Sequence, residues 1–229
     1  MKLELWDRYH CIILLASAVF FVFRHNMLFI VAIALLSFAI LIINSKDELM
    51  KLKPYGGWAN RVTGIRLIGI LVLALVNKQL TDWQITIWLA LLIPLDGVDG
   101  LLARNRNEQT AMGAYFDMET DVLFVCVASC ILFIRKLTGY EVLIMAFSRY
   151  FYVFIVYMCR LHHIKEQRTR IGPPVAVFIF SAVTLAFVVP DEVRLWVIYS
   201  AILLLIISFS YSFMLLLKQH RKNIAQPNF

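Results

Sequence analysis

The sequence has little charge. Only 16% of its 229 residues are Asp, Glu, Lys or Arg, whereas a soluble domain carries about a quarter. The residue types Ala, Val, Ile, Leu, Met, Phe, Trp, Tyr and Cys make up 61% of the chain, and the mean hydropathy is +0.77. This composition excludes a disordered chain and a soluble basic domain that binds nucleic acid. It predicts a membrane protein.

Cysteine is also scarce. The four cysteines, Cys11, Cys126, Cys130 and Cys159, all lie inside apolar stretches, which predicts that they are small buried hydrophobic side chains. Cys126 and Cys130 are one helical turn apart, but no further Cys or His lies near them in the sequence to complete a metal site. These positions argue against a small disulfide scaffold and against a cysteine-based metal site.

The apolar residues form eight long stretches. A bilayer core about 30 Å thick requires roughly 20 apolar residues in a helix, and the candidate spans are residues 9–23, 27–44, 60–77, 83–104, 112–134, 140–160, 172–189 and 194–217. No small-x-small cleavage site follows Phe23, which argues against a secretory signal. We therefore predict an all-α polytopic membrane protein of about eight transmembrane helices. It would comprise an N-terminal transmembrane hairpin (1–50), a six-helix membrane domain (51–218) and a cytoplasmic tail (219–229).

The basic residues predict the orientation of these spans. The chain has 22 Lys and Arg against 15 Asp and Glu, a net charge of +7. With the N-terminus in the cytoplasm, sixteen basic residues fall on the cytoplasmic side and five on the other, while Arg149 lies within a span. Such a bias is the positive-inside distribution of membrane proteins. It predicts that both termini are cytoplasmic and that the net charge reflects topology rather than a nucleic-acid partner.

Four acidic residues lie in predicted membrane spans, where the free energy of inserting an acidic side chain is unfavourable. Asp96, Asp99, Asp117 and Asp121 lie in predicted spans near their cytoplasmic ends, where an aspartate costs about 2.5–3.5 kcal/mol on insertion scales. The members of each pair are three or four residues apart, so each pair shares a helix face. The short connection after Arg104 makes the two helices antiparallel neighbours. We therefore expect the four carboxylates to converge near the cytoplasmic surface.

Four clustered carboxylates require positive charge between them. Oxygen ligands without His or Cys suit a hard divalent ion, Mg²⁺ or Mn²⁺, and four carboxylates are enough to hold two such ions. Small residues on the same helix faces, Gly100, Ala103 and Gly113, would let a bulky ligand approach the backbone. Alternatively, the acids pair with arginines or carry ions in a cation-coupled transporter. Transporters commonly contain internal repeats; none is visible here, so a binding site is favoured.

The acidic residues belong to a longer pattern that resembles the signature of the CDP-alcohol phosphotransferase (CDP-alcohol phosphatidyltransferase) family. The pattern reads Asp96-Gly97-Val98-Asp99-Gly100-Leu101-Leu102-Ala103-Arg104, then eight residues, then Gly113-x3-Asp117-x3-Asp121. A second family pattern, Asn-x-x-Thr-x-x-Arg, is matched by Asn60, Thr63 and Arg66, although Ala59 stands where a proline is common. The six-helix core of that family corresponds to residues 60–217, and the resemblance does not cover the hairpin at 9–44.

The resemblance implies a membrane enzyme of phospholipid biosynthesis. Such an enzyme transfers a phospho-alcohol group, here expected to be phosphatidyl, from a CDP-linked lipid such as CDP-diacylglycerol to an acceptor hydroxyl and releases CMP. It implies two divalent ions held by Asp96, Asp99, Asp117 and Asp121, with Asp121 also acting as the catalytic base. Cytidine diphosphate binding is implied for Asn60, Thr63, Arg66, Gly100, Ala103, Arg104 and Gly113. A homodimer is also implied, and the charge bias predicts an active site that faces the cytoplasm.

The sequence leaves the acceptor alcohol open. Arg149 lies inside the predicted span 140–160, where a lone cation is costly. It either binds a phosphate of the acceptor or donor, together with Arg168 and Arg170, or it pairs with a site carboxylate. Glu119 lies on the opposite side of its helix from the neighbouring aspartates, which predicts that it faces away from the metals.

Overall fold

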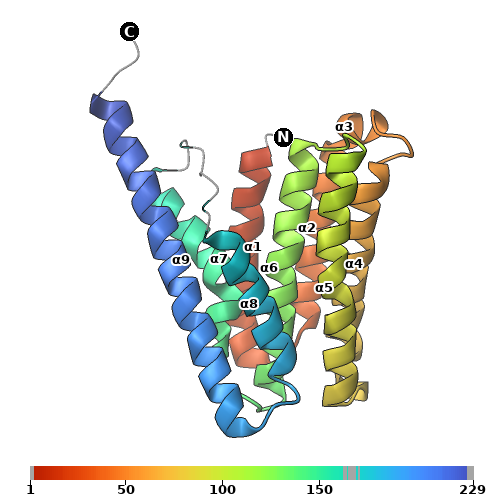
Figure 1. The fold of residues 1–229 in the computed structure, drawn as a ribbon, viewed down its shortest axis with the longest axis vertical. Helices are drawn as coiled ribbons and strands as arrows, with labels where there is room; N and C mark the ends of the chain where they lie inside the picture. The colour runs from red at the N-terminus through yellow and green to blue at the C-terminus, as the bar shows by residue number, and fades with distance from the viewer. Residues whose placement is uncertain (1–2, 162–163, 165–168, 170, 226–229) are drawn as a thin grey trace.

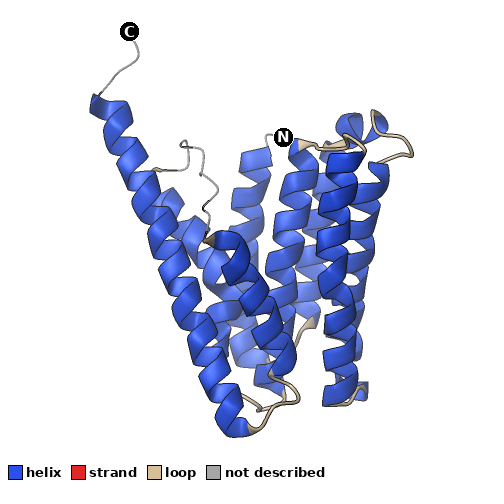
Figure 2. Ribbon diagram, in the orientation of Figure 1, coloured by secondary structure: helices blue, strands red, loops and turns tan. Residues whose placement is uncertain are grey.

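The computed structural model describes residues 3–161, 164, 169 and 171–225. All regular elements in these residues are helical (Figure 2). Their order is α1 (Leu3–Arg24), α2 (Leu28–Asn44), α3 (Lys46–Met50), α4 (Gly57–Val76), the 3-10 turn η1 (Asn77–Gln79), α5 (Asp82–Asn105), α6 (Ala111–Ile134), α7 (Val142–Met158), α8 (Gly172–Leu185) and α9 (Asp191–Ala225). The long helices lie side by side as a bundle, and α1 begins at the same end of it at which α9 ends (Figure 1).

Each of the eight apolar stretches corresponds to one helix, which confirms the prediction of an all-α polytopic membrane protein. α1, α4 with the η1 turn, α5 and α9 are long and apolar enough to cross a membrane, and α2, α7 and α8 are shorter apolar helices. α6 has 24 residues and carries Asp117, Glu119 and Asp121 in its first half. α6 is as long as the helices that can cross a membrane, but these three acids within its length distinguish it from them.

The structure differs from the predicted spans at several helix ends, and α1 already begins at Leu3 rather than at residue 9. α9 continues through Ala225, because the polar residues that follow its apolar part include no Gly or Pro to end the helix. α8 already ends at Leu185, before Pro190. The residue that precedes a proline disfavours the helical conformation, so the helix could not continue as far as predicted. Cys159 is exposed just after the end of α7, whereas the other three cysteines are buried as predicted.

The helix α6 lies at the centre of the bundle. It contacts α1, α2, α4, α7 and α8, and all its side chains from Leu123 to Leu132 are buried. A helix that is buried on all sides has to be apolar on all sides, as this half of α6 is apart from Ser129. The N-terminal hairpin packs directly on the core, because α1 contacts α7 and α6 while α2 contacts α4 and α6. The domain boundary at residue 50 remains a prediction.

Threonine caps set where α5 and α6 begin. The Thr81 hydroxyl accepts the N–H of Gln84 and the Gln84 side chain accepts the N–H of Thr81, a capping box that starts α5. The Thr110 hydroxyl accepts the N–H of Gly113 at 2.9 Å and starts α6. Since a helix turns 100° per residue, these starting points also determine which way the aspartates of each helix face.

Candidate active site

Four aspartates from α5 and α6 converge beside α4, the helix against which both of these helices pack. Asp96 and Asp99 lie in the second half of α5, and Asp117 and Asp121 lie in the first half of α6. The chain reverses direction between these helices (Figure 1), so the two pairs face each other. One oxygen of each of Asp96, Asp99 and Asp117 lies within 4.8 Å of the other two. The structure confirms the predicted convergence of the carboxylates. It corrects the prediction that the two helices are direct neighbours, because α5 and α6 pack mainly on α4 rather than on each other.

The side chain of Arg66, on α4, lies among all four carboxylates. Its Nη1 atom is 2.9 Å from Asp96, 3.5 Å from Asp117 and 3.6 Å from Asp99, and its Nη2 atom contacts Asp121. Only 2% of the Arg66 side chain is exposed. Four ionised aspartates with one arginine retain a net negative charge of three, so the site still favours further cations.

The carboxylate group fits a hard divalent cation. Thr63 donates a hydrogen bond of 2.8 Å to Oδ2 of the buried Asp99, whereas Oδ1 of Asp99 is buried and has no hydrogen-bond partner among the residues that the structure describes. A buried carboxylate oxygen without a partner is costly, and a metal ion would satisfy it. The surrounding ligand atoms are carboxylate oxygens, which Mg²⁺ and Mn²⁺ prefer.

The other residues of the two sequence patterns surround the aspartates. Asn60 donates from its side chain to the carbonyl of Gly56 at 2.9 Å, and it lies so close to α6 that a Cβ atom on Gly113 would be 2.8 Å from its Oδ1. A Cβ atom on Gly100 would be 3.5 Å from the guanidinium of Arg104. The residues of the two patterns therefore lie on α4 and on the two helices that pack against it, α5 and α6.

Glu108 also contributes to this region, and sequence reasoning missed it. It lies in the connection from α5 to α6, where its N–H donates to the carbonyl of Ala103 at 2.9 Å, and its carboxylate accepts the N–H of Ala59 at 3.0 Å. The residue is 7% exposed. A carboxylate at a helix N-terminus is stabilising, so Glu108 holds the start of α4 against the α5–α6 connection. No local spacing in the sequence links residues so far apart in the chain.

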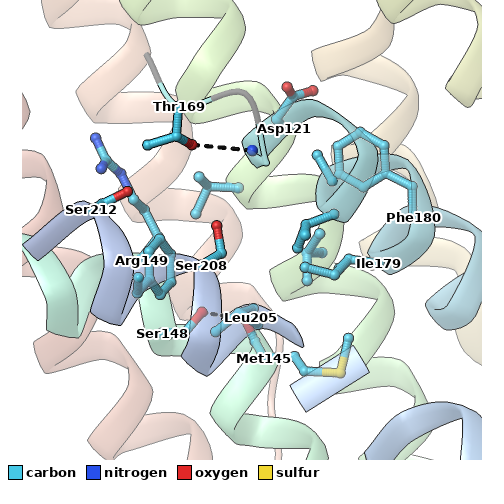
Figure 3. Close-up of a pocket in the computed structure, with 16 residues that line it drawn as sticks. Asp121, Met145, Ser148, Arg149, Thr169, Ile179, Phe180, Leu205, Ser208 and Ser212 are labelled. Carbon is cyan, nitrogen blue, oxygen red and sulfur yellow. Dashed lines mark hydrogen bonds between the residues drawn. The ribbon is translucent and has the colours of Figure 1, made fainter. Parts of the chain in front are cut away.

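A cavity of about 270 Å³ lies beside the aspartates, between α6, α7, α8 and α9. Its polar lining residues are Asp121, Ser148, Arg149, Thr169, Ser208 and Ser212. Figure 3 shows Arg149, Ser212 and Thr169 on one side of it, opposite Ile179 and Phe180. Asp121 belongs both to the carboxylate group and to the wall of the cavity.

Arg149 pairs with a different carboxylate from those expected. Its Nε atom lies 3.8 Å from Glu119, and its Nη2 atom lies 3.3 Å from the sulfur of Met118. The carboxylate beside Arg149 is thus that of Glu119, which lies outside the group of four aspartates that the second alternative named. Binding of an anion by Arg149 remains a prediction. Arg168 and Arg170, the other two predicted members of an anion pocket, lie outside the described residues.

Glu119 faces away from the aspartates, as its helical position predicted. It is fully buried, and its carboxylate lies 3.4 Å from the imidazole of His10 on α1. Asp117 and Asp121 on the same helix instead contact Arg66. Sequence reasoning did not single out His10, because a lone histidine in an apolar stretch carries no spacing signal.

Comparison with known protein families agrees with the geometry. The family model described as CDP-alcohol phosphatidyltransferase matches residues 57–207, which include all four aspartates, Arg66 and Arg149. Neither the curated proteins nor the solved structures include a significant match to the chain. The matched segment starts at the first residue of α4 and covers well over half of the sequence. The chain belongs to the CDP-alcohol phosphatidyltransferase family, a family of membrane-embedded transferases of substituted phosphate groups.

Proposed function

We propose that the protein transfers a phosphatidyl group from CDP-diacylglycerol, or a related group from another CDP-alcohol, to an acceptor alcohol in phospholipid biosynthesis. Membership of the family supports a CDP-alcohol donor, an alcohol acceptor and a lipid environment. The observation that supports group transfer at this site is the position of Asp121. Its side chain contacts Arg66 in the carboxylate group and also lines the adjacent cavity. A group in that position can reach both the reacting phosphate and the attacking hydroxyl.

Asp96, Asp99, Asp117 and Asp121 would hold two divalent ions. Family membership supports the use of divalent metals in general. The buried Oδ1 atom of Asp99, which has no partner in the described part of the chain, supports a ligand at this place. When bound, such ions neutralise the diphosphate, polarise the attacked phosphorus and stabilise the departing CMP. Thr63 orients Asp99 through its hydrogen bond to Oδ2, which leaves Oδ1 available to a metal ion.

The donor diphosphate would lie over the meeting point of α4, α5 and α6. Arg66 supplies a buried positive charge there, and Arg104 supplies a second at the end of α5. Gly100, Ala103 and Gly113 have little or no side chain, which lets the nucleotide approach the backbone. Asn60 and Thr63 complete the proposed cytidine diphosphate site. The lipid tails of the donor would stay in the bilayer.

The acceptor would enter the cavity from the side of Arg149. Its hydroxyl oxygen forms a bond to the β-phosphorus, the bond from that phosphorus to the CMP oxygen breaks, and the hydroxyl proton goes to the carboxylate of Asp121. A carboxylate surrounded by cations is a weak base, so much of the rate has to come from positioning. Arg149 would bind an anionic group of the acceptor, for which the hydroxyls of Ser208 and Ser212 supply further hydrogen bonds.

Release of CMP tests this proposal. Purified protein is incubated with CDP-diacylglycerol, Mg²⁺ or Mn²⁺, and one alcohol at a time, including glycerol 3-phosphate and myo-inositol, and labelled CMP is counted. We expect metal-dependent release with one class of acceptor. A cation-coupled transporter would instead move cations across vesicles and release no CMP, so the assay separates the two functions. The cytoplasmic orientation of the site and the homodimer remain predictions.

Gly113→Ala should weaken donor binding selectively. The added Cβ atom would be 2.8 Å from Asn60 Oδ1 and 3.0 Å from Thr110 Oγ1, so the side chain of Asn60 has to shift within the proposed nucleotide site. We expect the donor KM to rise about tenfold, equivalent to ~1.4 kcal/mol. Gly64→Ala is the matched control, because its added Cβ atom meets nothing within 4 Å. An unchanged donor KM for Gly113→Ala would contradict the role of this contact.

A further inference from the structure

His10 lies in the part of the chain that the family model does not match, yet it reaches the core of the bundle. It belongs to α1 of the N-terminal hairpin and is 1% exposed. Its Nε2 atom is 3.4 Å from the carboxylate of Glu119 on α6. The hairpin is therefore joined to the helix that carries two of the four aspartates by a contact between polar groups, as well as by apolar contacts.

The hairpin holds the His10 ring in one orientation. Its Nδ1 atom lies 2.7 Å from the hydroxyl of Ser37 on α2. The ring of Trp6 stacks on it with centroids 4.8 Å apart, and the Trp6 indole N–H donates to the carbonyl of Ser37 at 2.9 Å. Contacts from both helices of the hairpin thus direct the other ring nitrogen toward Glu119.

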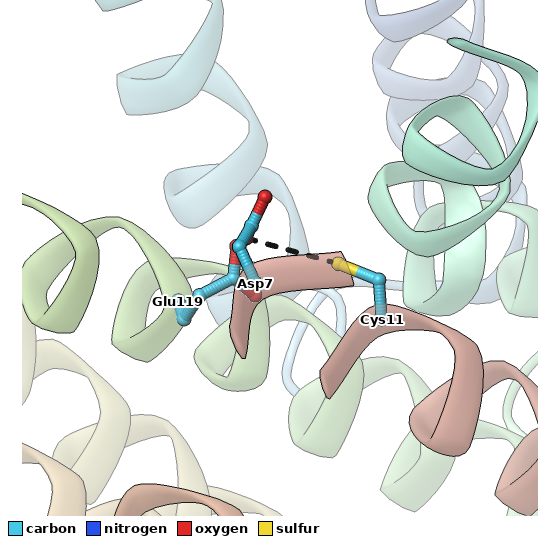
Figure 4. Close-up of side chains that lie close together, drawn as sticks. All are labelled: Asp7, Cys11 and Glu119. Carbon is cyan, nitrogen blue, oxygen red and sulfur yellow. Dashed lines mark hydrogen bonds between the residues drawn. The ribbon is translucent and has the colours of Figure 1, made fainter. Parts of the chain in front are cut away.

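Glu119 lies between this histidine and Arg149, at ion-pair rather than hydrogen-bond distance from each. Its side chain is fully buried, with His10 at 3.4 Å on the α1 side and Arg149 at 3.8 Å on the α7 side. Figure 4 shows Glu119 beside Asp7 and Cys11 of α1, and ligand atoms of these three residues lie within 4.8 Å of one another. A buried carboxylate is stable only with compensating partners, and Glu119 has basic groups on both sides.

Arg149 is the member of this group that reaches the cavity. Its side chain lines the wall together with Asp121, and it is 14% exposed. An arginine side chain has many rotamers, and holding it in one of them requires fixed partners. Glu119 and the sulfur of Met118 are two such partners on α6.

We propose that His10, acting through Glu119, positions Arg149 in the acceptor cavity, so that the N-terminal hairpin is part of the acceptor site. The proposal rests on the proposed function for the identity of the cavity's ligand. His10 and Glu119 are positioning residues: neither lines the cavity, and both act on the reaction through the guanidinium of Arg149. The chain Ser37, His10, Glu119, Arg149 runs from α2 through α1, α6 and α7 to the cavity.

A double-mutant cycle tests this coupling. His10→Phe keeps an aromatic ring in place but removes the nitrogen that faces Glu119, Glu119→Gln keeps the shape but removes the charge, and Arg149→Gln removes the cation. With the alcohol identified by CMP release, we expect each single variant to raise the acceptor KM about tenfold, with the donor KM changed less than about twofold. On the Arg149→Gln background, His10→Phe should add less than about a further twofold. His25→Phe, in the exposed α1–α2 turn, is the matched control and should leave both constants unchanged.

The same variants are followed by thermal unfolding, which needs no substrate. Coupling predicts that each single variant lowers Tm by about 5 °C and that the His10→Phe and Arg149→Gln losses are not additive. Multiplicative KM effects, additive losses of Tm, or an unchanged acceptor KM in a folded His10→Phe or Glu119→Gln protein would overturn the proposal. If the wild-type protein released no CMP with any acceptor, the proposed function would fail instead, and the thermal cycle would still decide whether the three residues are coupled.

Discussion

Asp99→Asn should abolish metal-dependent turnover and leave the protein folded. The substitution keeps the size of the side chain but removes the charge of the most buried of the four aspartates, which is 3% exposed. We expect CMP release to fall at least about 1,000-fold, equivalent to ~4 kcal/mol of transition-state stabilisation. Stability without metal should not fall, because one of four mutually repelling charges is gone. Asp117→Asn is expected to behave in the same way.

Three measurements check this prediction: CMP release, Tm in EDTA, and the rise in Tm when Mg²⁺ or Mn²⁺ is added. The wild-type protein should show the metal-dependent rise, and Asp99→Asn should lose most of it. Asp47→Asn is the matched control, because Asp47 lies exposed on α3. Full activity in the Asp99→Asn protein would remove Asp99 from the proposed site.

Arg66→Gln should destabilise the protein in the absence of metal. Arg66 is the buried cation that contacts all four aspartates, and removing one partner of a buried pair costs about 3–5 kcal/mol. Asp96 and Asp117 are 38% and 41% exposed, so solvent screens part of the repulsion and we expect the low end of this range. For a chain of this size, ~3 kcal/mol corresponds to a Tm lower by about 6–12 °C.

Divalent metal should restore much of the lost stability, because it supplies the positive charge that Arg66 no longer provides. Thermal unfolding is measured in EDTA and then in Mg²⁺ or Mn²⁺. Arg61→Gln provides a matched control on the same helix, since Arg61 is exposed and lies over the ring of Trp58. Equal Tm values for the wild-type and Arg66→Gln proteins in EDTA would show that Arg66 does not neutralise the aspartates.

The sequence alone was enough to predict the convergence of the aspartates, and the reason is local. Asp96 and Asp99 share a helix face through a spacing of three residues, and Asp117 and Asp121 share one through a spacing of four. A short connection brings together the ends of α5 and α6 that carry these pairs, although both helices pack mainly on α4. The same periodicity correctly predicted that Glu119 faces the other way. Each of these inferences concerns residues on one helix or on two consecutive helices.

The partner of each charge was decided by the tertiary structure. The sequence assigned Arg66 to nucleotide binding, but did not indicate that its guanidinium lies among all four carboxylates, up to 55 residues away in the chain. Equally, no spacing rule pairs Glu108 with the start of α4. Such contacts depend on how neighbouring helices are rotated about their axes, which the whole core determines through side-chain shape.

The sequence by itself thus determined the class of the protein, its apolar spans and the family signature, because hydropathy and helical spacing are properties of short segments. The tertiary structure decided that Asp121 borders a cavity and that Arg149 lines the same cavity. It also brought His10 of the hairpin to Glu119 in the core. These arrangements require four or more helices to pack against one another, and that mutual fit is not encoded in any one of them.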